Sequence, residues 1–296
     1  MTDLVLALDV GGTKIAGALV DRDGRVRRSA RRPTPVDDAE RTWQEVRAVI
    51  TEALAGEVVA GVGIACAGPV HTGDGTVSPI NIERWQDFPL RDRVADELPG
   101  VRVELAGDGV CMALGEHWLG AARESRFVVG LVVSTGVGGG LVLDGKPYGG
   151  RSGNAGHLGH VVVEPDGLPC TCGGRGCVET VAGGPNLVRW ARAQGWQARD
   201  AAELAEQARA GEEIPLAAFE RAGRAVGLAI AATAAVCDLD LAVIGGGVAQ
   251  AGELLFGPVR RTLATHAGLS YLAGLTVVPA TLGGDAGLVG AARLVT

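Results

Sequence analysis

Two histidines and three cysteines fall within one short stretch, HLGHVVVEPDGLPCTCGGRGCVET, at positions 157–180. They are His157, His160, Cys170, Cys172 and Cys177. Imidazole nitrogens and thiolates are the ligands that zinc prefers in proteins. In a reducing compartment a tight cysteine cluster is more often a metal site than a set of disulfides. The spacing therefore predicts a metal site, with buried thiols that hold no metal as the alternative.

Glycine-rich turns form a second group of residues that could do chemistry. Asp9-Val-Gly-Gly-Thr-Lys14 places backbone N–H groups, a hydroxyl and an ammonium beside a carboxylate, and successive N–H groups in a tight turn suit phosphate. Ser134-Thr-Gly-Val-Gly-Gly-Gly140 repeats the pattern, and Val243-Ile-Gly-Gly-Gly-Val248 breaks a third strand at its carboxyl end. One such turn alone is equally well an ordinary hairpin. Together the three predict a nucleotide bound across a cleft.

The elements that must position these turns recur along the chain. A short apolar strand, a glycine turn, a second strand and an Asp-Gly turn occur at 4–24 and again at 127–145. Apolar residues at helical spacing follow at 40–54, then a strand at 58–64. A buried helix at 225–237 leads to a strand at 239–244, and a final helix begins near Ala286. The recurrence indicates an internally duplicated α/β module, with amphipathic helices at 189–224.

Composition bounds the function. The chain has 296 residues, 47% of them hydrophobic but only 4% aromatic, which is typical of α/β proteins with about two domains. A net charge of −7 without a basic stripe argues against a nucleic-acid partner. The first residues carry no basic segment of a signal peptide, and no apolar run reaches the length of a membrane span. We expect a cytoplasmic protein with no membrane or nucleic-acid partner.

In these motifs the chain resembles the ROK family (repressors, open reading frames, kinases), whose sugar kinases belong to the actin-like ATPase superfamily. The resemblance rests on DVGGTK, on STGVGGG, on Gly159-His160, on Cys-x-Cys-x4-Cys-x-Glu at 170–179, and on the late IGGG. It implies an actin-like ATPase (ribonuclease H-like) fold of two duplicated α/β domains around a cleft. The domains would be 1–117, joined by the helix at 285–296, and 118–284. Because the sequence opens directly on the first strand, a DNA-binding repressor is not expected.

The resemblance also implies a zinc ion held by His160, Cys170, Cys172 and Cys177. A zinc site in which protein fills all four positions is structural, since none is left for water. The zinc would then brace the loop at 157–180 instead of activating a nucleophile.

Asp108 matches the family's catalytic base, which receives the proton of the sugar hydroxyl. From the residues alone, an Asp before Gly is more often a turn or helix-capping residue. Position 107 is glycine where kinases of the family usually have asparagine, so one sugar contact is missing or is supplied elsewhere.

Four further residues match sugar contacts of the family: Asn81, His157, His160 and Glu179. Asn81 is equally well an ordinary turn residue. His157 stands where glucokinases of the family usually have glutamate, and resembles bacterial N-acetylmannosamine kinases. A neutral imidazole offers one donor and one acceptor in place of a purely accepting carboxylate, which leaves the sugar open.

The nucleotide would be Mg·ATP, with Asp9 orienting the magnesium through water. The matching phosphate and nucleotide contacts are Asp9, Gly11, Gly12, Thr13, Lys14, Thr135, Gly136, Gly138, Gly246 and Gly247. The resemblance further implies a homodimer or homotetramer.

The leading hypothesis is an ATP-dependent hexose kinase of the glucokinase type, acting on the 6-OH. N-acetylmannosamine or another hexose derivative is an alternative substrate, and polyphosphate an alternative donor. A sugar-binding regulatory protein with weak or no kinase activity is the alternative from another class, motivated by Gly107 and His157.

Overall fold

The computed structural model describes residues 3–296, which divide into two compact units. The first unit contains residues 3–123, 140–156 and 284–296, and the second contains 124–139 and 157–283. Residues 140–156 cluster with the first unit, although the sequence places them within the second domain. Their strand β10 (Lys146–Tyr148) contacts helix α3 (Asp108–Leu119), and Gly140 lies directly against the backbone of Val110.

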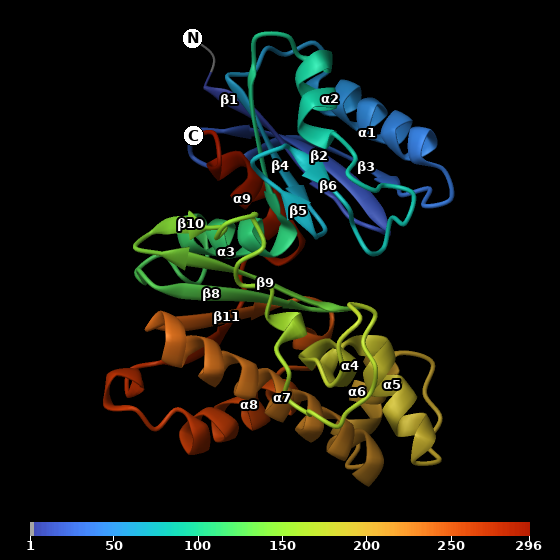
Figure 1. The fold of residues 1–296 in the computed structure, drawn as a ribbon, viewed down its shortest axis with the longest axis vertical. Helices are drawn as coiled ribbons and strands as arrows, with labels where there is room; N and C mark the ends of the chain where they lie inside the picture. The colour runs from blue at the N-terminus through green and yellow to red at the C-terminus, as the bar shows by residue number, and fades with distance from the viewer. Residues whose placement is uncertain (1–2) are drawn as a thin grey trace. The chain divides into compact units, whose positions relative to one another are not determined.

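The first unit is built on a five-stranded sheet (Figure 1). Its strands, in spatial order, are β3 (Val26–Pro33), β2 (Lys14–Asp21), β1 (Leu4–Val10), β4 (Gly61–Cys66) and β7 (Arg102–Gly107). β1, β2 and β3 form an antiparallel meander, whereas β4 and β7 run parallel to β1. β1 and β4 are apolar along almost their whole length because helices cover both faces of the sheet.

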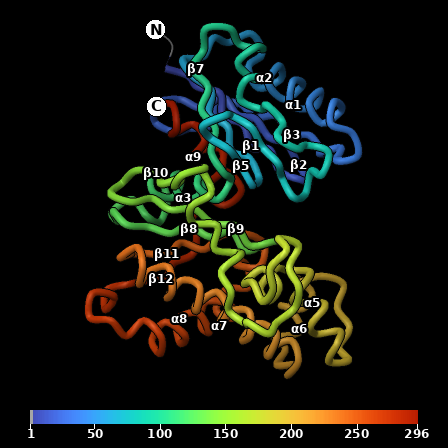
Figure 2. Tube along the Cα trace, in the orientation of Figure 1, coloured from blue at the N-terminus to red at the C-terminus, as the bar shows by residue number. Residues whose placement is uncertain are grey.

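Two helical layers provide that cover. α1 (Ala39–Leu54) and α2 (Leu90–Glu97) bury their apolar sides on one face, with Trp43 and Trp85 among the buried side chains. α3 and α9 (Ala286–Arg293) pack on the other face. The C-terminal helix, red in Figure 2, lies against the blue β1. Asp38 caps α1 by accepting the N–H of Arg41 at 2.8 Å, which fixes where that helix begins.

The second sheet repeats the order of the first. Its strands are β10, β9 (Val137–Leu143), β8 (Val128–Val133), β11 (Leu241–Gly245) and β12 (Thr276–Pro279). As in the first sheet, strands that follow later in the chain, here β11 and β12, run parallel to β8. The matching order confirms the duplicated α/β modules that the recurring strand–turn–strand pattern predicts.

The helices of the second unit lie between strands of the second sheet in the chain, four of them before β11 and one between β11 and β12. They are α4 (Val178–Ala182), α5 (Gly184–Ala193), α6 (Ala201–Arg209), α7 (Glu213–Cys237) and α8 (Glu253–His266). The sequence places the start of the buried helix at Ala225, but α7 begins at Glu213. Pro215 falls in its first turn, where a missing N–H costs nothing, and Phe219 and Ala222 continue its buried face.

The remaining elements are short. They are the hairpin strands β5 (Val70–His71) and β6 (Thr76–Val77), and the 3-10 helices η1 (Leu158–His160), η2 (Val248–Ala251), η3 (Ser270–Leu272) and η4 (Gly283–Asp285). Among residues 3–296, none of the helices combines the length and the apolar character that crossing a membrane requires.

Candidate active site and metal centre

Two carboxylates lie at the carboxyl edge of the first sheet. Asp9 is near the end of β1, and Asp108 is the first residue of α3, directly after β7. Because β1, β4 and β7 are parallel, their carboxyl ends meet at one edge, where open α/β sheets bind ligands. The sheet thus brings together two acids that are 99 positions apart in the sequence.

The environment of Asp108 changes its acidity. The side chain keeps access to solvent, but protein crowds its remaining sides. This loss of hydration, together with the negative charge of Asp9, raises the pKa of Asp108 to about 6. The N–H of Gly109 donates to the carboxylate at 2.7 Å and opposes the rise. A carboxyl group with this pKa is ionised at neutral pH but accepts protons more readily than an ordinary one.

Asp9 is also perturbed. Burial raises the pKa of this carboxyl, and the positive charges of Lys14 and Arg31 oppose that rise. Arg31 is itself held by an ion pair with Asp285 at 2.9 Å. Asp9 therefore sits at a site where a cation is favourable, which suits the expected contact with hydrated magnesium.

The turn after β1 is closed by its own backbone. The N–H of Gly11 donates to the carbonyl of Lys14 at 3.0 Å, and the hydroxyl of Thr34 donates to the carbonyl of Gly11 at 2.6 Å. Thr13 and Lys14 are exposed at its tip. Gly12 packs against Asn81, one of the expected sugar contacts. A Cβ on Gly12 would lie 2.5 Å from Cγ of Asn81.

Gly107 leaves room next to Asp108. A Cβ at this position would meet no atom nearer than the carbonyl oxygen of Gly153, at 4.0 Å. The residue has an extended conformation that any amino acid adopts. Neither a clash at Cβ nor the backbone conformation therefore requires glycine at this position.

The glycine turn of the second unit is held by the helices that follow the cysteine cluster. The carbonyl of Ser134 accepts the N–H of Gly184 at 2.7 Å, and the N–H of Ser134 donates to the carbonyl of Gly136 at 2.9 Å. Glu179, in α4, accepts the N–H of Val137 at 3.0 Å. Thr135 and Gly136 thus belong to a turn with fixed ends, whereas Gly138 already lies in β9.

A cavity of about 500 Å³ opens beside this turn. The third glycine break closes one side, and its Gly246 has φ +96° and lies so near β8 that a Cβ would overlap the carbonyl of Val133. The lining residues are Ser134, Thr135, Gly184, Pro185, Val188, Arg192, Arg199, Asp200, Ala201, Ala202, Gly247, Val248 and Gln250. The sequence motifs include Ser134, Thr135, Gly247 and Val248 of these. The others lie outside the motifs, and the glycine pair before Pro185 is the one signal that could have pointed to them.

The structure brings together the histidine and the three cysteines expected to bind zinc. One ligand atom from each of His160, Cys170, Cys172 and Cys177 lies within 4.8 Å of every other. Sγ of Cys172 is 3.8 Å from Sγ of Cys177, and Sγ of Cys170 is 3.7 Å from Nδ1 of His160. A tetrahedral zinc with bonds of ~2.3 Å to sulfur has ligands about 3.8 Å apart. The four residues therefore fit a closed zinc site.

The chemistry of the thiols also suits a cation. The N–H of Gly174 points to Sγ of Cys172 at 3.4 Å and lowers the pKa of that thiol. Burial raises the pKa of the Cys177 thiol, so its ionisation requires a compensating positive charge nearby. A bound Zn²⁺ supplies that charge.

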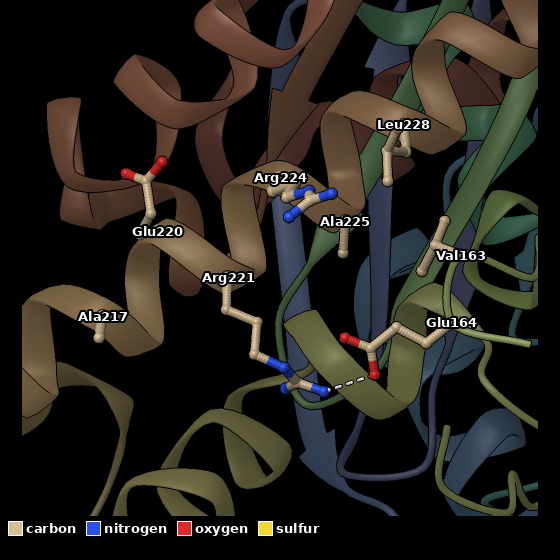
Figure 3. Close-up of a pocket in the computed structure, with 8 residues that line it drawn as sticks. All are labelled: Val163, Glu164, Ala217, Glu220, Arg221, Arg224, Ala225 and Leu228. Atoms are coloured by element: carbon tan, nitrogen blue, oxygen red, sulfur yellow. Dashed lines mark hydrogen bonds and ion pairs between the residues drawn. The ribbon is translucent and has the colours of Figure 1, made fainter. Parts of the chain in front are cut away.

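The loop that carries the cysteines is tied to the longest helix of the unit. Glu164 forms an ion pair with Arg221 of α7, with 2.7 Å between the carboxylate oxygen and the guanidinium nitrogen (Figure 3). The N–H groups of Val163 and Glu164 both donate to the carbonyl of Gly176, which precedes Cys177. A cavity of about 480 Å³ lies between this segment and α7, lined by Val163, Glu164, Ala217, Glu220, Arg221, Arg224, Ala225 and Leu228.

His157 and His160 lie side by side, with ring centroids 4.8 Å apart. Since Nδ1 of His160 faces Cys170, Nε2 is the nitrogen left for another contact. Burial, and then the neighbouring His160, lower the pKa of His157, while Glu179 opposes this shift. His157 is consequently neutral at pH 7, with one donor and one acceptor.

Comparison with known proteins places the chain in a family. The ROK family profile matches residues 5–296. The chain belongs to the ROK family. A glucokinase of Thermotoga maritima is 35% identical over 309 residues, which cover 98% of this chain and 96% of that protein. An N-acetylmannosamine kinase of Citrobacter koseri is 38% identical over 291 residues, covering 98% and 97%.

A solved relative shows the same fold. The ROK family glucokinase of Streptomyces griseus, in complex with glucose and AMPPNP, superposes with a TM-score of 0.86 at 35% identity and covers 98% of both chains. The fold of this ROK protein is accordingly the expected actin-like ATPase fold, and these three relatives are sugar kinases.

Proposed function

We propose that this ROK protein is an ATP-dependent sugar kinase that phosphorylates a hexose, with glucose and its 6-OH as the first candidate. The observation that carries the proposal is the Asp108 carboxylate, whose pKa of about 6 suits a general base, on the same sheet edge as the glycine turn after β1. The similarity of the chain to a glucokinase and to an N-acetylmannosamine kinase supports sugar phosphorylation as the reaction class.

In the proposed reaction Asp108 accepts the proton of the sugar hydroxyl as its oxygen attacks the terminal phosphorus of ATP. The bond from that phosphorus to the ADP oxygen breaks, and ADP leaves. Backbone N–H groups of the turns at 11–14 and 134–136 hold the phosphates, and Lys14 adds a positive charge. Mg²⁺, when bound with ATP, neutralises charge on the phosphates, and Asp9 would orient one of its waters.

The cavity of about 500 Å³ beside Thr135 and Gly247 is the proposed nucleoside pocket. Its position next to two glycine turns supports this assignment, as does its size, which lies in the range of small-molecule sites. Arg192, whose guanidinium donates to the carbonyl of Ala198 at 2.6 Å, and Gln250 would border the nucleoside.

His160, Cys170, Cys172 and Cys177 would hold one zinc ion in a structural role. All four tetrahedral positions are then filled by protein, so no metal-bound water is available as a nucleophile. Nε2 of His160 would donate to a sugar hydroxyl while Nδ1 stays on the metal, which links the metal site to substrate binding.

N-acetylmannosamine is the second candidate substrate. Neutral His157 and the open space beside Gly107 both favour it, because the family's usual carboxylate and amide contacts are absent from these positions. Asn81, His160 and Glu179 would bind hydroxyl groups common to both sugars. Three further expectations remain predictions: a regulatory sugar-binding role, motivated by Gly107 and His157; a homodimer or homotetramer, implied by the family resemblance; and a cytoplasmic location, expected from the sequence.

The test is sugar-dependent formation of ADP. The protein is incubated with Mg·ATP and a panel that includes glucose, mannose and N-acetylmannosamine, and ADP is quantified by chromatography. The proposal predicts ADP that depends on one or more of these sugars. Sugar binding in calorimetry without ADP formation would instead support the regulatory role.

A further inference from the structure

Glu179 contacts the glycine turn of its own unit directly. Its Oε2 accepts the N–H of Val137 at 3.0 Å. The same oxygen occupies the space beside Gly136, where a Cβ would lie 2.5 Å from it. One carboxylate oxygen thus supports two successive residues of the turn that is proposed to hold phosphate.

The backbone of Glu179 is fixed as well. Its carbonyl accepts the side-chain amide of Asn186 at 2.6 Å and the N–H of Gly183 at 3.1 Å. Gly184, the next residue, donates its N–H to the carbonyl of Ser134 at 2.7 Å, at the start of the turn. The beginning of α5 and the Glu179 side chain therefore hold the turn from both ends.

The first unit contains the same kind of contact. Asn81, another proposed sugar ligand, lies over Gly12 of the other glycine turn so closely that a Cβ on Gly12 would be 2.5 Å from its Cγ and 2.7 Å from its Nδ2. In each unit, then, a residue on the sugar side rests on a glycine of the phosphate turn. The repetition is independent of the Glu179 geometry.

We propose that Glu179 is a positioning residue for the nucleotide turn at 134–137 in addition to a sugar ligand, so that sugar and nucleotide binding are coupled through this one carboxylate. The proposal rests on the proposed kinase function for the identity of the two ligands. Oε2 supports the turn, which leaves Oε1 for a sugar hydroxyl.

The physical basis is the ordering of a side chain. A hydroxyl that donates to Oε1 restricts the rotation of the carboxylate and keeps Oε2 on the N–H of Val137. The nucleotide then meets a turn that is already ordered and loses less conformational entropy on binding. By thermodynamic reciprocity the nucleotide must strengthen sugar binding by the same factor.

The test measures nucleotide affinity without sugar. Binding of Mg·AMPPNP to wild type, Glu179→Ala and Glu179→Gln is followed by isothermal titration calorimetry. Loss of a hydrogen bond to a charged group should weaken binding to the alanine variant about ten-fold. The amide oxygen of glutamine still accepts the N–H of Val137, so that variant should stay within about three-fold of wild type while its sugar affinity falls. Equal nucleotide affinity in all three proteins would overturn the proposal.

A second test compares Gly136→Ala in two backgrounds, so that the conclusion does not depend on the Glu179 substitutions alone. Gly136→Ala places a methyl group on Oε2 of Glu179 and on no other side chain nearby, and this glycine does not have a positive φ. Gly136→Ala should therefore weaken Mg·AMPPNP binding in the wild-type background but not in Glu179→Ala. Equal losses in both backgrounds would show that Gly136 acts independently of the carboxylate and would contradict the coupling.

The kinetic readout separates this role from sugar binding alone. Glu179→Ala should raise KM for ATP as well as KM for the sugar, and Glu179→Gln should raise mainly the latter. A wild-type protein that binds AMPPNP but phosphorylates no sugar refutes the kinase while the coupling is still decided by the nucleotide titrations. A wild-type protein that binds no nucleotide overturns both.

Discussion

Lowering the pH from 7 to 5 is expected to reduce kcat/KM for the sugar about ten-fold. The pKa of Asp108 is about 6, raised by the loss of hydration where protein crowds the carboxyl and by the charge of Asp9. With that value the carboxylate is about 90% ionised at pH 7 and about 10% ionised at pH 5, and only the ionised form accepts the hydroxyl proton. The loss should follow a single midpoint near pH 6, because kcat/KM reports the pKa of the free enzyme.

Two variants test the cause of this profile. Asp108→Asn removes the proposed base and should lower kcat by about 10²- to 10⁴-fold at every pH. Asp9→Asn removes the like charge, so the pKa of Asp108 should fall and the midpoint should move to lower pH, at reduced overall activity. Initial rates are measured between pH 5 and 8 at saturating Mg·ATP, with ADP quantified by chromatography. A flat profile across this range, or an unchanged midpoint in Asp108→Asn, would refute the reasoning.

The same shift has a consequence for stability. Because the folded protein raises the pKa of Asp108 above the value of an unfolded chain, the favourable contribution of this group is complete below about pH 4 and is lost as pH rises through about 6. Asp108→Asn should therefore keep or raise the melting temperature at pH 7.5 and lose that advantage at pH 4. A lower melting temperature at pH 7.5 would contradict this sign.

Three further predictions concern structure. Cys172→Ser should remove one equivalent of bound zinc and lower the melting temperature by about 5 °C or more, measured by metal analysis and calorimetry. Gly63→Ala should destabilise the fold by about 3 kcal/mol in denaturant titrations, since a Cβ there overlaps the carbonyl of Ala291 in α9. Glu164→Gln, which breaks the 2.7 Å ion pair with Arg221, should cost under about 1 kcal/mol because both side chains are partly exposed.

The first two of these predictions have a matched control variant. Cys237 lies outside the candidate metal cluster, so the Cys237→Ser variant should keep its bound zinc. Loss of zinc in this variant would mean that the cluster is not the zinc site. Gly73→Ala adds a methyl group where nothing lies within 4 Å, and should be nearly neutral. If Gly63→Ala were equally neutral, the close packing of α9 on β4 would be wrong. A loss of several kcal/mol in Glu164→Gln would show that the ion pair is far more important than its exposure indicates.

Much of the fold is predictable from local patterns. The duplicated modules were visible because apolar strands, glycine turns and Asp-Gly turns recur in the same order, and each of these signals depends on residues that are neighbours in the chain. The start of α7 was missed because Glu213 to Arg224 is amphipathic and the following part is almost wholly apolar, so one helix reads as two segments. The place of residues 140–156 in the first unit depends on their packing against α3, which no local pattern encodes.

The candidate site likewise contains features that local sequence predicts and features that depend on distant contacts. The four residues of the candidate metal site were predictable because they lie within 18 positions and carry distinctive chemistry. The contact of Asn81 with Gly12 and the bond from Val137 to Glu179 join segments far apart in the sequence, and neither could be read from residue types. The raised pKa of Asp108 was equally hidden, because it arises from the crowding of its carboxyl by protein and from Asp9 across the sheet.

The most direct test of the central claim is the mass of the sugar after incubation with Mg·ATP, compared between wild type and Asp108→Asn. The account predicts that wild type adds one phosphoryl group to glucose or N-acetylmannosamine and that the variant, with its zinc content intact, adds almost none. Equal phosphorylation by the two proteins, or an unmodified sugar in the presence of folded wild type, would contradict it.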